Sequence, residues 1–134
     1  MIDISEADFV YDLPDGLDYH VSQGGKNVSG GQKQRLSIAR ALIKDPDILI
    51  FDDSFSALDY KTDKLVRQKL NEEYKNTTKV IVAQRIGTIM NADQIIVLDQ
   101  GKMVGKGTHK QLLKKCKVYR EIALSQLSEE ELEK

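Results

Sequence analysis

The stretch from residue 27 to residue 35, with the sequence NVSGGQKQR, has the residue types of a phosphate-binding turn. Ser29 carries a hydroxyl, and Gly30 and Gly31 follow it directly before an expected helix whose first turn is basic. Backbone N–H groups that are free at a helix N-terminus bind phosphate oxygens, and glycines leave the backbone open to such a ligand. A glycine-rich turn that only caps a helix is the other interpretation, and these residues alone do not separate the two.

Two adjacent carboxylates follow an apolar run further along the chain. Residues 47–51 have the continuous apolar pattern of a strand that is buried on both faces, as at the centre of a parallel sheet. The run stops at Asp52 and Asp53. A carboxylate at a strand end can hold Mg²⁺ through its water shell, because Mg²⁺ prefers oxygen ligands and keeps several waters. Two acids that merely end a strand at the surface are the alternative.

The composition is that of a single globular domain. The 134 residues are 40% hydrophobic and 31% charged, and the net charge is −1, so no bulk attraction to nucleic acid or to an anionic membrane is expected. One cysteine, Cys116, excludes an internal disulfide and a cysteine-based metal cluster, and a half-buried helical position explains it. Because no apolar run approaches about 18 residues and the N-terminus does not resemble a signal peptide, we expect a soluble, cytosolic chain.

Helices and strands that would position these residues alternate along the chain. The expected helices are 5–12 (capped by Ser5), 31–43, 60–74, a short segment near 87–91, a Thr108-capped helix through Leu113, and an amphipathic helix through Tyr119, Ile122, Ala123 and Leu127. The expected strands are 47–51, 79–83, 94–98 and an edge strand at 102–107 that follows a turn at Gly101. Residues 16–29 are expected to form a loop. This alternation predicts an α/β fold with a mostly parallel sheet.

Taken together, these patterns resemble the nucleotide-binding domain of ATP-binding cassette (ABC) transporters. NVSGGQKQRLSIARAL at 27–42 resembles the signature motif, and ILIFDDSFSALD at 48–59 resembles the Walker B strand and D-loop. Residues 80–113 resemble the switch region and the C-terminal hairpin of exporter-type members. The resemblance covers roughly residues 6–125. It implies a P-loop NTPase-like core with a mostly parallel sheet and a signature helical subdomain, with the N-terminal phosphate-loop part absent.

The resemblance also implies how the chain is organised. Residues 1–134 would be a partial nucleotide-binding domain. The parts within it are a helical and signature region at 5–46, the Walker B strand, D-loop, switch strand and hairpin at 47–107, C-terminal helices at 108–127 and an acidic tail at 128–134.

In this family two domains pair head to tail, and each signature motif covers the ATP that the other domain holds. The residues that would cover the partner's ATP are Ser29, Gly30, Gly31 and Gln32. The D-loop would be Ser56, Ala57, Leu58 and Asp59, with Asp59 reaching across the dimer. Gln23, Gly24 and Gly25 would contact the transmembrane domain, although Ser22 and Gln23 depart from the commoner Gly-Glu-x-Gly pattern.

Two positions depart from the family pattern where hydrolysis takes place. Asp52 would hold Mg²⁺ through water, but Asp53 stands where the family places a glutamate that polarises the attacking water. Its carboxylate would lie on the order of 1 Å short, and such a misplacement can slow a reaction about 100-fold. Gln84 stands before Arg85 where the family has a histidine, and an amide carries no charge and does not titrate near neutral pH. His20 and His109 are expected at the surface.

These departures resemble the impaired half of heterodimeric exporters, in which one site binds ATP and Mg²⁺ and barely hydrolyses. The expected partners are a second nucleotide-binding domain in a different subunit and the transmembrane domain of the same transporter, with no nucleic acid. Such a transporter would place the chain at the cytoplasmic face of the cell membrane. The chain itself has no GxxxxGK[ST] phosphate loop, so we expect ATPase activity only in the intact parent.

Two other functions are alternatives to an exporter subunit. A chromosome- or repair-type ATPase shares a signature motif and a Walker B strand, but it lacks the hairpin and helix of residues 93–113 and carries heptads that are absent here. A truncated remnant that acts only as an interaction module is the remaining alternative, and in-frame coding sequence for a phosphate loop and membrane helices upstream of Met1 would exclude it.

Overall fold

The computed structural model describes residues 1–128 and residue 131, and the chain forms two compact units, Met1–Val82 and Ala83–Lys134. The boundary between them falls within the segment 47–107 that the resemblance treats as one part. Most of the predicted acidic tail at 128–134 lies outside the described residues. Within the described part of the chain, no helix combines the length and the apolar character that crossing a membrane requires.

The first unit opens with three short 3₁₀ turns, η1 (Asp8–Asp12), η2 (Gly16–Asp18) and η3 (Gln23–Gly25). The predicted helix over 5–12 is therefore wrong in type and start. Ser5 does not cap it: this residue is buried, and its Oγ donates to the Ile2 carbonyl at 3.1 Å. Glu6 has a left-handed backbone with φ of 54°, which interrupts any helical path from Ser5 to Ala7.

Helix α1 (Gly30–Leu42) is capped by Ser29, and its bounds confirm the predicted helix to within one residue at each end. Its buried side chains are Ile38, Ala39 and Leu42. Ile43, which the helical spacing also placed on this face, is 71% exposed, because it follows the last helical residue.

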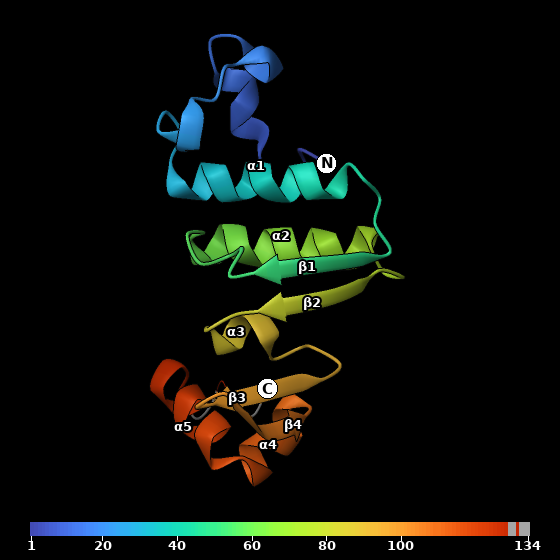
Figure 1. The fold of residues 1–134 in the computed structure, drawn as a ribbon, viewed down its shortest axis with the longest axis vertical. Helices are drawn as coiled ribbons and strands as arrows, with labels where there is room; N and C mark the ends of the chain where they lie inside the picture. The colour runs from blue at the N-terminus through green and yellow to red at the C-terminus, as the bar shows by residue number, and fades with distance from the viewer. Residues whose placement is uncertain (129–130, 132–134) are drawn as a thin grey trace. The chain divides into compact units, whose positions relative to one another are not determined.

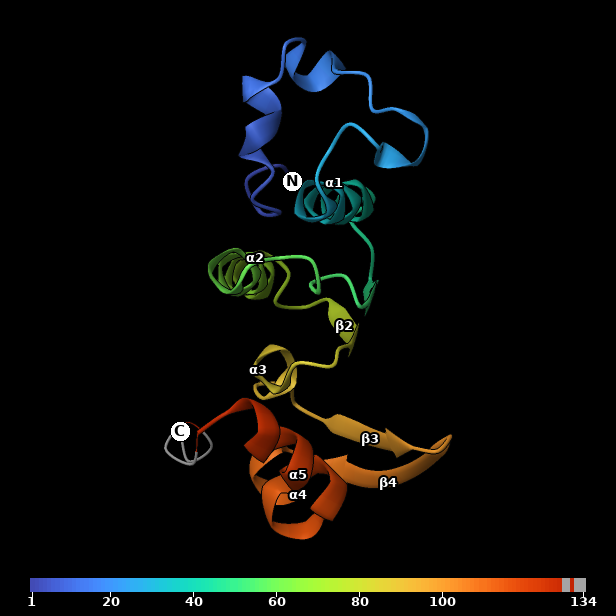
Figure 2. The ribbon, with the colours of Figure 1, turned by 90° about the vertical axis from the view of Figure 1, so that its left-hand side faces the viewer.

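Strands β1 (Ile48–Asp52) and β2 (Thr78–Val82) form a parallel pair in which Ile50 lies opposite Val80. Helix α2 (Tyr60–Glu73) connects them and lies beside the pair in both views (Figures 1 and 2). The core of this unit consists of Ile38, Leu42, Leu49, Phe51, Phe55, Leu58, Val66, Leu70 and Tyr74.

The expectation that the first strand is buried on both faces is wrong for this chain. Burial alternates along β1, with Leu49 and Phe51 inside the core. Ile48 and Ile50 point the other way and are 59% and 70% exposed. The sequence pattern is that of a doubly covered strand, whereas the described residues cover one face of it only.

The second unit contains α3 (Ile86–Ile89), an antiparallel hairpin of β3 (Ile95–Asp99) and β4 (Lys102–Gly107), α4 (His109–Lys115) and α5 (Lys117–Gln126). The hairpin turns through Gly101, whose φ is 74°, as its sequence predicts. The core of the second unit consists of Ile86, Ile95, Val97, Leu112, Cys116, Tyr119 and Ala123. The α/β class is thus confirmed, and the described strands form one parallel and one antiparallel pair.

Two residues of the second unit lie deeper than expected. His109, predicted at the surface, is 5% exposed, because its ring turns inward and its Nδ1 lies 2.7 Å from the hydroxyl of Tyr119. Cys116 is fully rather than half buried and lies between α4 and α5. His20 is exposed, as predicted.

Candidate functional site

The start of α1 carries a capping box that leaves two backbone donors open. The Ser29 hydroxyl accepts from the Gln32 N–H at 3.1 Å, and the Gln32 side chain accepts from the Ser29 N–H at 2.9 Å. Within the described residues, the N–H groups of Gly30 and Gly31 have no acceptor. They point out of the positive end of the helix, and the backbone there is free of side chains, so an anion can approach them.

The loop before α1 is fastened by side chains that sequence reasoning missed. Gly24 and Gly25 have φ values of 75° and 67°, and Lys33 donates from Nζ to the Gly24 carbonyl at 2.9 Å. Asn27 accepts from the Ser22 backbone N–H at 2.9 Å and donates to the His20 carbonyl at 2.8 Å. These contacts fix the predicted membrane-contact residues Gln23–Gly25 relative to α1.

The carboxylates Asp52 and Asp53 lie at the carboxyl end of β1, and both are exposed. Asp53 has a φ of 51°, a left-handed conformation that aspartate adopts more readily than most residues. Its N–H donates to the Val82 carbonyl of β2 at 3.0 Å, and its carbonyl accepts from the Ser56 hydroxyl at 2.9 Å. The turn therefore ends the strand and directs the chain away from the sheet.

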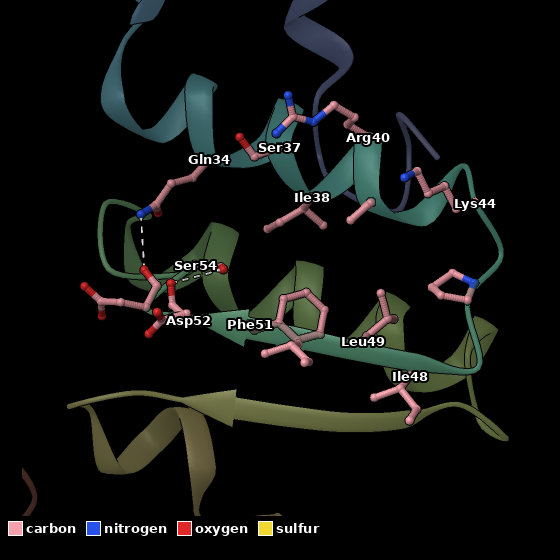
Figure 3. Close-up of a pocket in the computed structure, with 14 residues that line it drawn as sticks. Gln34, Ser37, Ile38, Arg40, Lys44, Ile48, Leu49, Phe51, Asp52 and Ser54 are labelled. Atoms are coloured by element: carbon pink, nitrogen blue, oxygen red, sulfur yellow. Dashed lines mark hydrogen bonds between the residues drawn. The ribbon is translucent and has the colours of Figure 1, made fainter.

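The loop at 54–59 contacts α1 directly. The amide group of Gln34 bonds Asp53, Ser56 and Ala57, and Figure 3 shows Gln34 pointing from α1 toward this loop. A Cβ at Gly31 would lie 3.1 Å from the Ala57 carbonyl oxygen. The predicted signature residues and the predicted D-loop are therefore neighbours in one chain. Gln34 was missed, although its spacing places it one turn beyond Gly30 and Gly31 on the same helix face.

Asp59, the last residue of the predicted D-loop, caps α2. One carboxylate oxygen accepts from the Thr62 N–H at 3.0 Å and the other from the Thr62 hydroxyl at 2.6 Å. These hydrogen bonds, the one from the Thr62 hydroxyl most of all, lower the pKa of Asp59. Its predicted reach across a dimer stays a prediction.

Gln84, which the resemblance predicts to be a second departure from the family pattern, belongs to the second unit and is exposed. Its backbone carbonyl accepts from the Gln126 side chain at 2.8 Å, and the other end of that amide accepts from the Ile86 N–H at 2.8 Å. Gln126 of α5 thus holds the backbone on both sides of Arg85.

The described residues contain no group of three or more His, Cys, Asp or Glu side chains arranged to hold a metal ion. Asp52 offers one exposed carboxylate at the strand end. Mg²⁺ is usually bound by one or two carboxylates together with waters and substrate phosphates, so this donor fits a shared magnesium site and does not form a cage by itself.

A groove of about 770 Å³ runs between α1 and β1 (Figure 3). Lys44 lies at one end of it and Asp52 at the other, and Leu49 and Phe51 of β1 lie between them. The exposed Ile48 and Ile50 of β1 also line it. The middle of the groove is lined by apolar side chains. A phosphate-binding site would instead present several backbone N–H donors.

Comparison with known proteins agrees with the motifs. Residues 3–56 match the family model described as ABC transporter. This chain is 48% identical to a putative ABC transporter ATP-binding protein from Mycoplasma genitalium over 118 residues, which are 88% of the chain. Over 106 residues, 79% of this chain, it is 49% identical to an ATP-dependent lipid A-core flippase from Shewanella oneidensis. The chain spans 19% and 18% of the lengths of these two relatives.

Among solved structures, a bacterial Atm1-family ABC exporter with ATP bound matches with a TM-score of 0.90 and 39% identity. The match covers 96% of this chain and 23% of the exporter chain. Both the sequence and the fold are therefore those of part of an ATP-binding domain.

Proposed function

We propose that this chain, which is part of the ATP-binding domain of an ABC transporter, covers ATP held by a second such domain in an exporter. The observation that carries this proposal is the open start of α1, where Gly30 and Gly31 present free N–H groups beside the Ser29 hydroxyl. In this account Ser29, Gly30, Gly31 and Gln32 bind the phosphates of the partner's nucleotide. The similarity to exporter relatives and to the Atm1-family structure supports the direction of transport.

The chain's own site is proposed to hydrolyse ATP slowly. Asp52 would help to hold Mg²⁺, whose charge stabilises the phosphate oxygens during transfer. Asp53 would face the γ-phosphate with a carboxylate that is one methylene shorter than glutamate, so it would position water poorly. Gln84 can donate a hydrogen bond to phosphate but adds no charge. The phosphate loop itself would come from outside this sequence, so the isolated chain is expected to be inactive.

The remaining contacts follow from the same proposal. Gln23, Gly24 and Gly25 would contact the transmembrane domain at the cytoplasmic face of the membrane, and the second nucleotide-binding domain would belong to a different subunit. The exposed apolar side chains of Ile48 and Ile50 support a larger domain in which more of the protein packs on this face of the sheet. The β3–β4 hairpin and α4 favour an exporter over a chromosome- or repair-type ATPase.

Trapping nucleotide separately at the two sites of the intact transporter tests the proposal. Turnover at the site built on Asp52, Asp53 and Gln84 should be slow. The double change Asp53→Glu with Gln84→His should raise it about 10- to 100-fold, because it restores the longer carboxylate and a titratable donor. If the double variant is folded and paired but gains no turnover, the assignment of these two residues is wrong.

A further inference from the structure

The side-chain amide of Gln34 joins α1 to the loop after β1 through three hydrogen bonds. Its Nε2 donates to the Asp53 carbonyl at 3.3 Å and to the Ser56 hydroxyl at 3.1 Å, and its Oε1 accepts from the Ala57 N–H at 2.9 Å. A primary amide has two donor hydrogens and one acceptor oxygen, so the loop matches the whole group. Gln68 offers a contrast, because it donates to Glu72 one turn away on its own helix.

A second contact joins the same two segments at the start of the helix. A Cβ at Gly30 would lie 3.6 Å from the Cβ of Ala57, and a Cβ at Gly31 would lie 3.1 Å from the Ala57 carbonyl oxygen. The helix backbone at Gly31 therefore comes close to the Ala57 carbonyl, and the small Ala57 side chain lies beside Gly30. The first turn of α1 and the loop at 54–59 are attached at two places, one on each side of a helical turn.

Asp53, the loop residue whose carbonyl accepts from Gln34, has a strained backbone. The φ of 51° at Asp53 is unfavourable for a residue with a Cβ, and such conformations persist where surrounding interactions hold them. The Asp53 carbonyl accepts from Gln34, from the Ser56 hydroxyl and from the Ser56 N–H. Of these donors, Gln34 is the one that comes from outside the loop.

We propose that Gln34 is a positioning residue that makes the start of α1 and the turn at Asp53 move as one body. Closing Ser29–Gly31 over the partner's nucleotide would then also set the Asp53 carboxylate in this chain's own site. This coupling rests on the proposed function. Gln34 acts through the Asp53 carbonyl and the Ala57 N–H, and it contacts neither nucleotide.

The attachment itself is tested in the 134-residue chain by amide hydrogen exchange at Ala57. Gln34→Ala removes the acceptor and should speed this exchange about three- to tenfold, the effect of one hydrogen bond. Gln34→Glu keeps an acceptor for Ala57 and should leave the exchange close to that of the unchanged chain. Gln68→Ala is the matched control. If Gln34→Ala behaves like Gln68→Ala, the attachment is absent and the proposal fails.

The functional half is tested in the intact transporter by trapping nucleotide separately at the two sites. Gln34→Ala and Gln34→Glu should both lower kcat at this chain's own site about tenfold and leave its KM for ATP within about twofold, because both lose the donor to Asp53 and neither removes a nucleotide contact. Gln68→Ala should change neither constant. A Gln34 effect confined to KM, or no effect, overturns the coupling.

Ser29→Ala separates failure of this inference from failure of the proposed function. If Ser29→Ala lowers turnover and Gln34→Ala does not, the coupling alone is wrong. If Ser29→Ala leaves turnover unchanged, the signature assignment is wrong and the coupling falls with it, while the exchange experiment still decides whether the attachment exists.

Discussion

The helix starts of α1 and α4 are built from the same local pattern and differ in the residues that follow the cap. In each, a hydroxyl residue accepts from the backbone N–H three residues later, and a glutamine at that position accepts in return. The pairs are Ser29 with Gln32 and Thr108 with Gln111. Cap geometry alone would therefore assign both starts the same role.

The two residues after each cap account for the difference. Gly30 and Gly31 leave the first turn of α1 without side chains, and its N–H groups remain open. At α4 the first residue is His109, whose ring enters the core and meets Tyr119. A capping box thus fixes where a helix begins, and the side chains of the next two residues decide whether that start can receive a ligand or closes a core.

The largest expected effect comes from removing the hydroxyl partner of the buried His109 ring. Tyr119→Phe removes the hydroxyl that lies 2.7 Å from the buried His109 ring nitrogen. Loss of a partner for a buried polar atom should lower the free energy of unfolding by about 1–3 kcal/mol in urea denaturation. Tyr60→Phe, at a tyrosine that is 74% exposed, is the matched control and should change it by less than about 0.5 kcal/mol. Equal losses in the two variants would contradict the account of His109.

A pH series gives the same variant a second readout. Burial raises the pKa of Tyr119 from 10.0 to about 12, so between these values the unfolded chain loses a proton that the folded chain keeps. The free energy of unfolding should therefore fall as pH rises through this window and should not change with this group below pH 10. The fall should be shallower in Tyr119→Phe. It should not vanish, because burial, followed by the charges of Asp45 and Glu73, also raises the pKa of Tyr74.

Removing the cap of each helix tests whether the two starts differ in function, because both changes should lower the free energy of unfolding equally. Ser29→Ala and Thr108→Ala should each lower the free energy of unfolding by about 1 kcal/mol, since each deletes one N-cap acceptor. ATP turnover at the partner's site in the intact transporter should fall only with Ser29→Ala. If both variants reduce turnover alike, the loss reflects stability, and the open start of α1 has no special role.

The smallest expected effect on the free energy of unfolding comes from replacing Gly30 and Gly31 of α1 by alanine, one at a time. Gly30→Ala places a methyl at an ordinary 3.6 Å contact, so the better helix former should leave stability unchanged or slightly raised. Gly31→Ala places a methyl 3.1 Å from the Ala57 carbonyl oxygen, and moving that loop should lower the free energy of unfolding by about 0.5 kcal/mol. The reverse order in a denaturation series would show that the loop does not press on this helix start.

Features that depend on near neighbours in the chain were predictable from the sequence. The starts of α1 and α4 follow from a hydroxyl residue at the cap and a glutamine three residues later. The turn at Gly101 follows from the need for a positive φ. These interactions are complete within four residues, so the sequence pattern contains both partners.

Features that depend on distant partners were not predictable. Gln34 meets a loop about twenty positions away, and only the packing of α1 over β1 brings them together. His109 is buried because α5 returns its Tyr119 to the start of α4. The outer face of β1 differs from the prediction for a related reason: its residue pattern indicates coverage on both sides, and the described residues cover one side only.

The left-handed backbone at Asp53 bears on how this position can change by mutation. Codons for aspartate and glutamate differ only at the third base, so a single nucleotide substitution exchanges one acid for the other. Aspartate, with a short side chain that can bond the local backbone, tolerates a φ of 51° better than glutamate does. If Asp53 stands at the position proposed for a water-polarising glutamate, that glutamate is one nucleotide substitution away, and the left-handed turn favours the aspartate.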